Sequence, residues 1–274
     1  MMLNLFGLPR VGKTALLTFM LNEYAYDRER YKLMRNEIEL KNQGGFNLSI
    51  PQHPVLANYG CMFKKFGYSR RQSYFINPFR FGYVNKDVKT HFMPPYAVIG
   101  ITESQKYYNS RMSLFYPDWQ SRAIEQHGHN YIDMIFDTQR PTLNDINIHE
   151  LSSFIEVISL ENIVKHNKIV GHIWIVREIE NSALLDKYVS SGKRDKSCFE
   201  EKTITANYNV FDIYDSRMCK PKFYDGHFND DFDLQFYKGL DETKEGYKDY
   251  LETMNDELPK GFYQPRNVKK EGEK

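Results

Sequence analysis

Apolar residues in the first part of the chain change from a continuous run to helical spacing. Leu3 to Phe6 is a short apolar run that ends in a glycine loop. Thr14 to Tyr26 then repeats apolar side chains every three to four residues, at Leu17, Met20, Leu21 and Tyr24. This pattern predicts a strand, a loop and a helix. The charged stretch from Asp27 to Lys41 carries apolar residues that extend a helix until Gly44-Gly45 breaks it.

The middle of the chain predicts further strands and helices. Segments rich in β-branched and aromatic residues predict strands or hairpins at Val55 to Phe63, Tyr74 to Asn77 and Phe79 to Val84. The apolar run Tyr96 to Ile101 is typical of a strand that is covered on both faces. Later segments predict, in order, a helix over Trp119 to His127, a strand over Ile132 to Phe136, a helix over Asn144 to Leu151, and strands over Phe154 to Leu160 and Ile169 to Val176. This alternation predicts an α/β fold with a mainly parallel sheet flanked by helices.

The chain divides into three parts by texture. Residues 1–180 form the predicted core, and residues 181–266 are a more charged extension with strand candidates at Lys202 to Thr205 and Val210 to Tyr214. The extension either completes the sheet at its edge or forms a docking module. Residues 267–274 are nearly all charged or small and are expected to be disordered.

Composition limits the function classes. In 274 residues, 37 Lys and Arg stand against 36 Asp and Glu, so any contact with a polyanion has to be local. The basic runs Lys64-Lys65, Arg70-Arg71 and Lys193-Arg194 are candidates for such contacts. An odd set of 3 cysteines fits a reducing compartment. There is no signal-peptide pattern and no apolar tract near the roughly 20 residues of a membrane span, so we expect a cytoplasmic protein without a span of its own.

The glycine loop after the first strand carries a phosphate-binding motif. The sequence fits G-x-x-x-x-G-K-[ST] at every fixed position, between a predicted strand and a predicted helix. Its backbone N–H groups are expected to surround the β-phosphate, with the Lys13 ammonium on the β and γ oxygens and the Thr14 hydroxyl on Mg²⁺. The predicted nucleotide-binding residues are Gly7, Leu8, Pro9, Arg10, Val11, Gly12, Lys13, Thr14 and Ala15.

Hydrolysis needs polar groups at the ends of neighbouring strands. Glu103 follows a buried strand and is the candidate general base, and Gln139 follows the next strand as a candidate γ-phosphate sensor. Thr102 stands where an aspartate is usual, which is a defect in the pattern. Because side chains alternate along a strand, Asp137 and Gln139 are expected on one face, and we hypothesise that Asp137 supplies the missing carboxylate. The candidate metal ligands are therefore Thr14, Thr102 and Asp137.

Together these segments resemble the zonular occludens toxin-like (Zot) family, the assembly ATPases of filamentous phages, within the FtsK/HerA class of P-loop motors. The resemblance spans about residues 1–179 and is carried by the motif of residues 7–14, the strand end Ile101-Thr102-Glu103-Ser104-Gln105, Tyr108-Asn109-Ser110-Arg111, Gln126-His127-Gly128-His129 and Ile135-Phe136-Asp137-Thr138-Gln139-Arg140-Pro141. It implies a RecA-like core that hydrolyses ATP with Mg²⁺, in a homo-oligomeric ring. It also implies a role in moving phage DNA during virion assembly, with a virion or membrane-channel protein as partner, in the host cytoplasm or at the inner face of its membrane.

The sequence departs from the family pattern in three ways. Thr102 replaces the usual aspartate, Gly128 replaces a common arginine between two histidines, and the membrane span of filamentous-phage members is not predicted. Arg111 and Arg140 are the alternative candidates for an arginine that acts on a neighbouring subunit. Two other functions therefore stay open: a viral DNA-packaging ATPase of the same class that docks on a capsid portal, and a scaffold that binds nucleotide without hydrolysing it.

Overall fold

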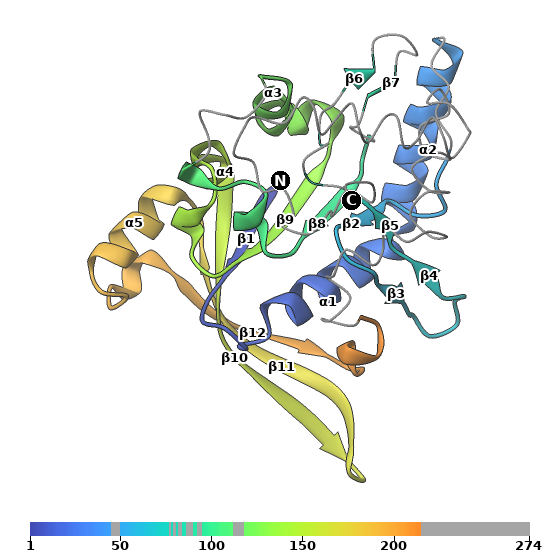
Figure 1. The fold of residues 1–274 in the computed structure, drawn as a ribbon. Coiled ribbons are helices and arrows are strands. Elements are labelled where there is room, and N and C mark those ends of the chain that lie inside the picture. The colour runs from blue at the N-terminus through green and yellow to red at the C-terminus, as the bar shows by residue number, and fades with distance from the viewer. Residues whose placement is uncertain are drawn as a thin grey trace, which may run out of the picture.

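The central feature of the fold is an eight-stranded sheet with the strand order β12-β11-β10-β1-β9-β8-β2-β5 (Figure 1). It is seen in a computed structural model that describes residues 1–44, 50–76, 78, 81, 84–85, 90–91, 95–111 and 118–214. The strands of the sheet are β1 Met2–Phe6, β2 Val55–Ala57, β5 Tyr74–Phe75, β8 Val98–Ile101, β9 Asp133–Thr138, β10 Ser152–Lys165, β11 Lys168–Ile179 and β12 Glu200–Ala206. Two small antiparallel pairs lie outside it, β3 Met62–Phe63 with β4 Arg71–Gln72, and β6 Val84–Asn85 with β7 Thr90–His91.

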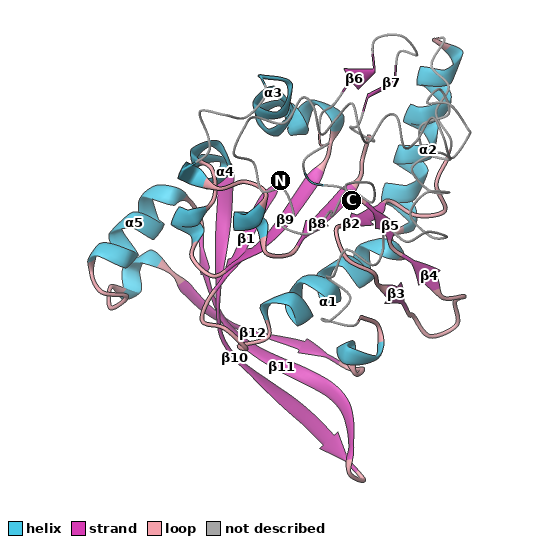
Figure 2. Ribbon diagram, viewed as in Figure 1, coloured by secondary structure: helices cyan, strands magenta, loops and turns pink. Residues whose placement is uncertain are grey.

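Helices lie on both faces of the sheet (Figure 2). They are α1 Lys13–Ala25, α2 Arg28–Gln43, α3 Asp118–Gln126, α4 Ile146–Leu151 and α5 Ser182–Ser190. Alternate side chains of each strand face opposite layers, as the period of two requires. In β9, for example, Ile135 faces the layer of α1, whereas Met134 and Phe136 face the layer of α3 and α4. None of the described helices has the length and apolar character that crossing a bilayer requires.

Five neighbouring strand pairs in the sheet are parallel. β1 lies between β10 and β9, β8 follows β9, and β2 and β5 follow β8. The predicted α/β fold with a mainly parallel sheet flanked by helices is confirmed. β9 lies between β1 and β8. Because these three strands are parallel, their carboxyl ends meet at one edge of the sheet.

The side of the sheet that ends in β12 departs from the predicted parallel arrangement. β10, β11 and β12 pair antiparallel. Only two residues separate β10 from β11, which is a hairpin connection and far too short for the crossover that a parallel pair needs. β12 comes from the predicted C-terminal extension and pairs with β11 over His172 to Glu178.

One predicted strand is wrong. Val210 to Tyr214 does not form a strand, because residues Val210–Asp212 are a turn of 3-10 helix. The side chain of Asn209 accepts a hydrogen bond from the Phe211 backbone N–H and caps this turn, which favours the helical conformation over an extended one. The predicted strand Phe79 to Val84 falls mostly outside the described residues, as do residue 77 and residues 215–274.

Candidate nucleotide-binding site

The phosphate loop joins the carboxyl end of β1 to the start of α1. Gly7 and Gly12 have φ angles of 149° and 88°, which L side chains rarely adopt. Space also requires glycine at both positions. A Cβ on Gly7 would lie 2.5 Å from the Val157 carbonyl oxygen, and one on Gly12 would lie 2.7 Å from Cδ2 of Leu160. The loop is therefore built against β10, and the N-terminus of α1 faces its interior, where an anion is favoured.

Lys13 is a buried cation within this loop. Only 8% of the residue is exposed, and its Nζ donates to the carbonyl oxygens of Gly7 at 3.1 Å and Leu8 at 3.0 Å. Burial lowers the pKa of the ammonium, and the nearby carboxylates of Asp137 and Glu103 oppose that shift. The charge thus lies where the loop curls back on itself, close to two acidic groups.

Asp137, near the end of β9, is the buried carboxylate of the site. It is 1% exposed and accepts three hydrogen bonds, from Thr14 Oγ1 at 2.6 Å, Thr102 Oγ1 at 3.0 Å and the Glu103 backbone N–H at 3.0 Å. Burial raises the pKa of Asp137, and these three hydrogen bonds oppose the shift. The structure therefore brings together the three residues proposed from the sequence as metal ligands: Thr14, Thr102 and Asp137.

The oxygen atoms of this cluster fit a magnesium ion. A carboxylate and two hydroxyls are hard donors, and Mg²⁺ in proteins is usually held by one or two carboxylates together with substrate phosphates and water. The cluster also lies beside the phosphate loop, because Thr14 is the second residue of α1. Thr102 takes part through its hydroxyl, so the unusual residue at that position is joined to the carboxylate of the adjacent strand.

Glu103 follows β8 in a left-handed backbone conformation, with φ 54°. The hydrogen bond from its N–H to Asp137 holds this conformation, which costs about 1 kcal/mol or more for a residue other than glycine. Its carboxylate accepts a hydrogen bond from Gln105 Nε2 at 2.9 Å and lies 3.5 Å from Lys106 Nζ. Glu103 is thus partly exposed at the same strand edge as the phosphate loop.

Most of the remaining predicted residues lie at the surface. β9 ends at Thr138, so Gln139 lies in the bend after the strand, where strand alternation no longer sets its direction, and its side chain is exposed. Leu8, Pro9 and Arg10 form the exposed crest of the loop, Val11 is partly buried, and Ala15 is buried in α1. Arg111 and Arg140 are both exposed.

Asn58 is a site residue that the sequence reasoning missed. Its Nδ2 donates to the Thr102 carbonyl at 3.0 Å, and its Oδ1 accepts from the Thr102 N–H at 2.8 Å. This pair of bonds holds the backbone of Thr102 on both sides of its Cα atom. Its position was visible in the sequence, since a polar residue directly after the apolar run Val55–Ala57 marks the carboxyl end of a buried strand.

Trp174 of β11 is a second missed residue. Its Nε1 donates to the Gly12 carbonyl at 3.2 Å, and the same carbonyl accepts the N–H of Leu16 at 2.9 Å in the first turn of α1. The indole is fully buried, and its ring centroid lies 5.6 Å from that of Phe19 of α1. The antiparallel edge of the sheet therefore supports the phosphate loop, a link that no local motif indicates.

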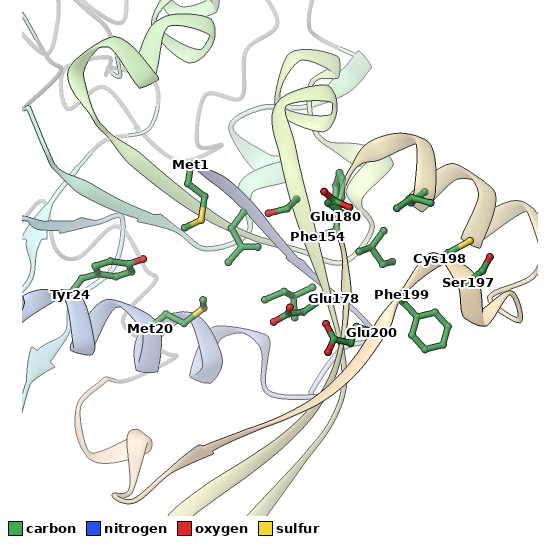
Figure 3. Close-up of a pocket in the computed structure, with 15 residues that line it drawn as sticks. Met1, Met20, Tyr24, Phe154, Glu178, Glu180, Ser197, Cys198, Phe199 and Glu200 are labelled. Carbon is green, nitrogen blue, oxygen red and sulfur yellow. The ribbon is translucent and has the colours of Figure 1, made fainter.

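A separate cavity of about 710 Å³ lies at the opposite end of β1 from the phosphate loop (Figure 3). It contains none of the predicted site residues. Glu178, Glu180 and Glu200 belong to its lining, so its charge does not suit a nucleotide. The candidate nucleotide site is the phosphate loop with the Asp137 cluster.

Comparison with known proteins gives structural likenesses only. No family model and no curated protein matches the chain. The N-terminal domain of zonular occludens toxin from Neisseria meningitidis is 17% identical, with 78% of this chain and 98% of that chain covered and a TM-score of 0.44. The genome packaging NTPase B204 from Sulfolobus turreted icosahedral virus 2, in complex with ATP-gammaS, is 10% identical, with 66% and 93% covered and a TM-score of 0.36. TM-scores this low carry no functional conclusion, so function has to be argued from the site itself.

Proposed function

We propose that this chain is a Mg²⁺-dependent ATPase that drives the movement of DNA during virus assembly. The observation that carries the ATPase part is the placement of one carboxylate, Asp137, within hydrogen-bond distance of the Thr14 hydroxyl, which follows the loop lysine. A phosphate loop, a buried cation and a cluster of oxygen ligands are thereby combined at one edge of a parallel sheet, where ligands of such folds bind.

Each element has a defined task in nucleotide binding. Backbone N–H groups of residues 7–15 would surround the β-phosphate, and Lys13 would exchange the carbonyls of Gly7 and Leu8 for the β and γ oxygens. Burial lowers the pKa of this ammonium because its charge loses solvation, and a phosphate anion would compensate that loss. Thr14 and Asp137, with Thr102 beside them, would hold Mg²⁺, which supplies neutralisation of the charge on the phosphate oxygens.

Glu103 would act as the general base that orients and polarises the attacking water. Its peptide N–H is bonded to Asp137, so the base and the metal ligand are held by the same turn. Gln105 and Lys106 contact the Glu103 carboxylate and keep it at this edge of the sheet. We assign Gln139, in the exposed bend after β9, as the sensor of the γ-phosphate.

The DNA part of the proposal rests on the series of motifs in the sequence. Its order matches the assembly ATPases of filamentous phages, so we propose a homo-oligomeric ring that moves phage DNA together with a virion or membrane-channel protein. DNA packaging at a capsid portal is the variant of this function in which no membrane attachment is needed.

A scaffold that binds ATP without hydrolysing it is the second candidate. Two observations favour it: the position before Glu103 carries a threonine, and the Glu103 carboxylate accepts a hydrogen bond from Gln105. In that case ATP would set the oligomeric state alone, and Glu103 would be a structural residue of the turn.

Steady-state ATP hydrolysis with Mg²⁺, with and without DNA, separates these functions. We expect turnover in the wild type, stimulation by DNA, and loss of at least about 100-fold in both Lys13→Ala and Glu103→Gln. Lys32→Ala and Glu150→Gln, which change exposed residues of α2 and α4, are the matched controls. Tight ATP binding that Lys13→Ala abolishes, without turnover in any variant, would replace the motor by the scaffold.

A further inference from the structure

The hairpin of β10 and β11 extends beyond the rest of the sheet as a two-stranded arm. Pairing of β10 with β1 ends at Glu156, and pairing of β11 with β12 ends at His172. Residues 163–171, here called the arm, therefore pair only with each other within the described structure. Figure 1 shows the arm projecting away from the helices and from the parallel part of the sheet.

The tip of the arm concentrates positive charge. Lys165 lies directly opposite Lys168, and the two residues between them, His166 and Asn167, both have positive φ angles, 48° and 59°. Like charges placed directly across a strand pair destabilise the hairpin. All four side chains are exposed, and neither lysine forms an ion pair with any residue that the structure describes. An anionic partner would relieve this repulsion.

Two cations of the basic runs singled out in the sequence differ from those at this tip. Lys193 pairs with the buried carboxylate of Glu156, and Arg71 donates to the Ala25 carbonyl while its guanidinium lies 4.9 Å from the ring centroid of Tyr26. These cations hold the fold together. The two arm lysines have no such internal role, which favours an external one.

We propose that the arm contacts the backbone of a nucleic acid through Lys165, His166 and Lys168. A two-stranded ribbon has the dimensions of the DNA major groove, and lysines at its tip meet phosphates on the groove edges. No acidic residue interrupts the sequence from Asn162 to Val176, so no charge on the arm itself opposes that contact. The inference builds on the proposed function, since it names the part of the chain that touches the DNA.

The base of the arm lies on the phosphate loop. Leu160, three residues before the arm in β10, lies opposite Trp174 of β11. Trp174 Nε1 donates to the Gly12 carbonyl, and a Cβ on Gly12 would lie 2.7 Å from Cδ2 of Leu160. The arm is thus continuous with the residues of β10 and β11 that lie against the phosphate loop, so a displacement of its tip would be transmitted to that loop. DNA bound by the arm would in this way alter the loop that binds the triphosphate, which gives a direct physical link between DNA contact and turnover.

The test compares Lys165→Ala/Lys168→Ala with the charge-matched control Lys32→Ala/Lys196→Ala, which changes exposed lysines elsewhere. Binding of a fluorescein-labelled DNA duplex is followed by anisotropy over a range of salt, without nucleotide. Loss of two phosphate contacts should make the slope of log K against log salt shallower by about 1.8. Basal ATP hydrolysis should stay at the wild-type rate while stimulation by DNA is lost, and Lys165→Arg/Lys168→Arg should restore both binding and stimulation.

Three results would overturn the arm's role: no DNA binding by the wild type, an unchanged salt slope in the arm variant, or a change in sedimentation behaviour alone, which would make the arm a contact between copies of the chain. Because binding is measured without nucleotide, the two proposals fail separately. Absence of hydrolysis removes the ATPase but leaves the DNA contact, and an unchanged salt slope does the reverse.

Discussion

Asp137→Asn is the substitution that tests the metal site most directly. The carboxylate accepts hydrogen bonds on both oxygens, from Thr14 and Thr102 on Oδ2 and from the Glu103 N–H on Oδ1. An asparagine can keep its oxygen toward Glu103 and turn its NH₂ toward the two hydroxyls. Hydroxyls rotate and can accept as well as donate, so the hydrogen bonds are conserved. The NH₂ group, however, cannot ligate a cation.

Stability and function should therefore change differently. Burial raises the pKa of Asp137, which means that the ionised carboxylate is held against a desolvation cost. Removing that charge should leave the free energy of unfolding unchanged or slightly increased. Loss of a contact to a charged group, worth about 1.5 to 3 kcal/mol, should lower turnover at subsaturating Mg²⁺ by about 10- to 150-fold. The half-saturating Mg²⁺ concentration should rise by a similar factor.

The geometry also predicts a rescue. Thr102 Oγ1 lies 3.0 Å from Asp137 Oδ2, so a carboxylate introduced at position 102 would reach the same ligand position. Thr102→Asp combined with Asp137→Asn should recover at least about tenfold of the lost turnover, about 1.4 kcal/mol. Asp145→Asn, which changes the buried cap of α4, is the control for the loss of a buried carboxylate. An Mg²⁺ dependence in Asp137→Asn that matches the wild type would refute the metal site.

Three further outcomes follow from the contacts of single side chains. Asn58→Leu removes both hydrogen bonds to the Thr102 backbone. It should lower kcat at least about tenfold in steady-state kinetics, with little change in the Kd for ATP measured by calorimetry. Equal losses in kcat and in ATP affinity would contradict a positioning role. Trp174→Phe keeps an aromatic ring but removes the donor to the Gly12 carbonyl, so ATP should bind about fivefold more weakly in calorimetry. An unchanged Kd would show that this hydrogen bond does not contribute to ATP binding. Burial lowers the pKa of His127 below 6.5, so protons bind the unfolded chain more readily and stability should fall as the pH drops below that value; melting curves of His127→Gln should show a smaller loss, and an identical pH dependence would contradict this.

The sequence predicted the parallel part of the sheet because its signals are local. A continuous apolar run that ends in glycine or in polar residues marks a buried strand, and Leu3 to Phe6 and Tyr96 to Ile101 both correspond to strands of the sheet. The phosphate motif was equally readable, since glycines with positive φ and the following lysine are fixed by spacing alone. The proximity of Asp137 to Thr102 was within reach because the carboxyl ends of neighbouring parallel strands meet at one edge.

The antiparallel edge could not be predicted in the same way. The run Ile169 to Val176 is apolar enough for a parallel strand. Its direction depends on the two-residue turn at His166 and Asn167, which lacks the glycine that usually signals such a turn. The contacts of Trp174 with Gly12 join residues far apart in the chain, and no periodicity reports them. Likewise, Asn58 gains its role only once β2 lies beside β8.

These missed contacts share one physical role. The phosphate loop is short, and Arg10, with φ 68°, is a residue other than glycine in the strained left-handed region, so contacts from outside help to hold the shape of the loop. Its conformation is held from outside, by β10 beneath both glycines and by the indole of Trp174 on the Gly12 carbonyl. The same two strands run on into the arm. Because β10 and β11 support the phosphate loop and also form the arm, a ligand bound by the arm would alter the loop. The geometry therefore favours a nucleotide site that is regulated from the arm over one that hydrolyses ATP independently of it.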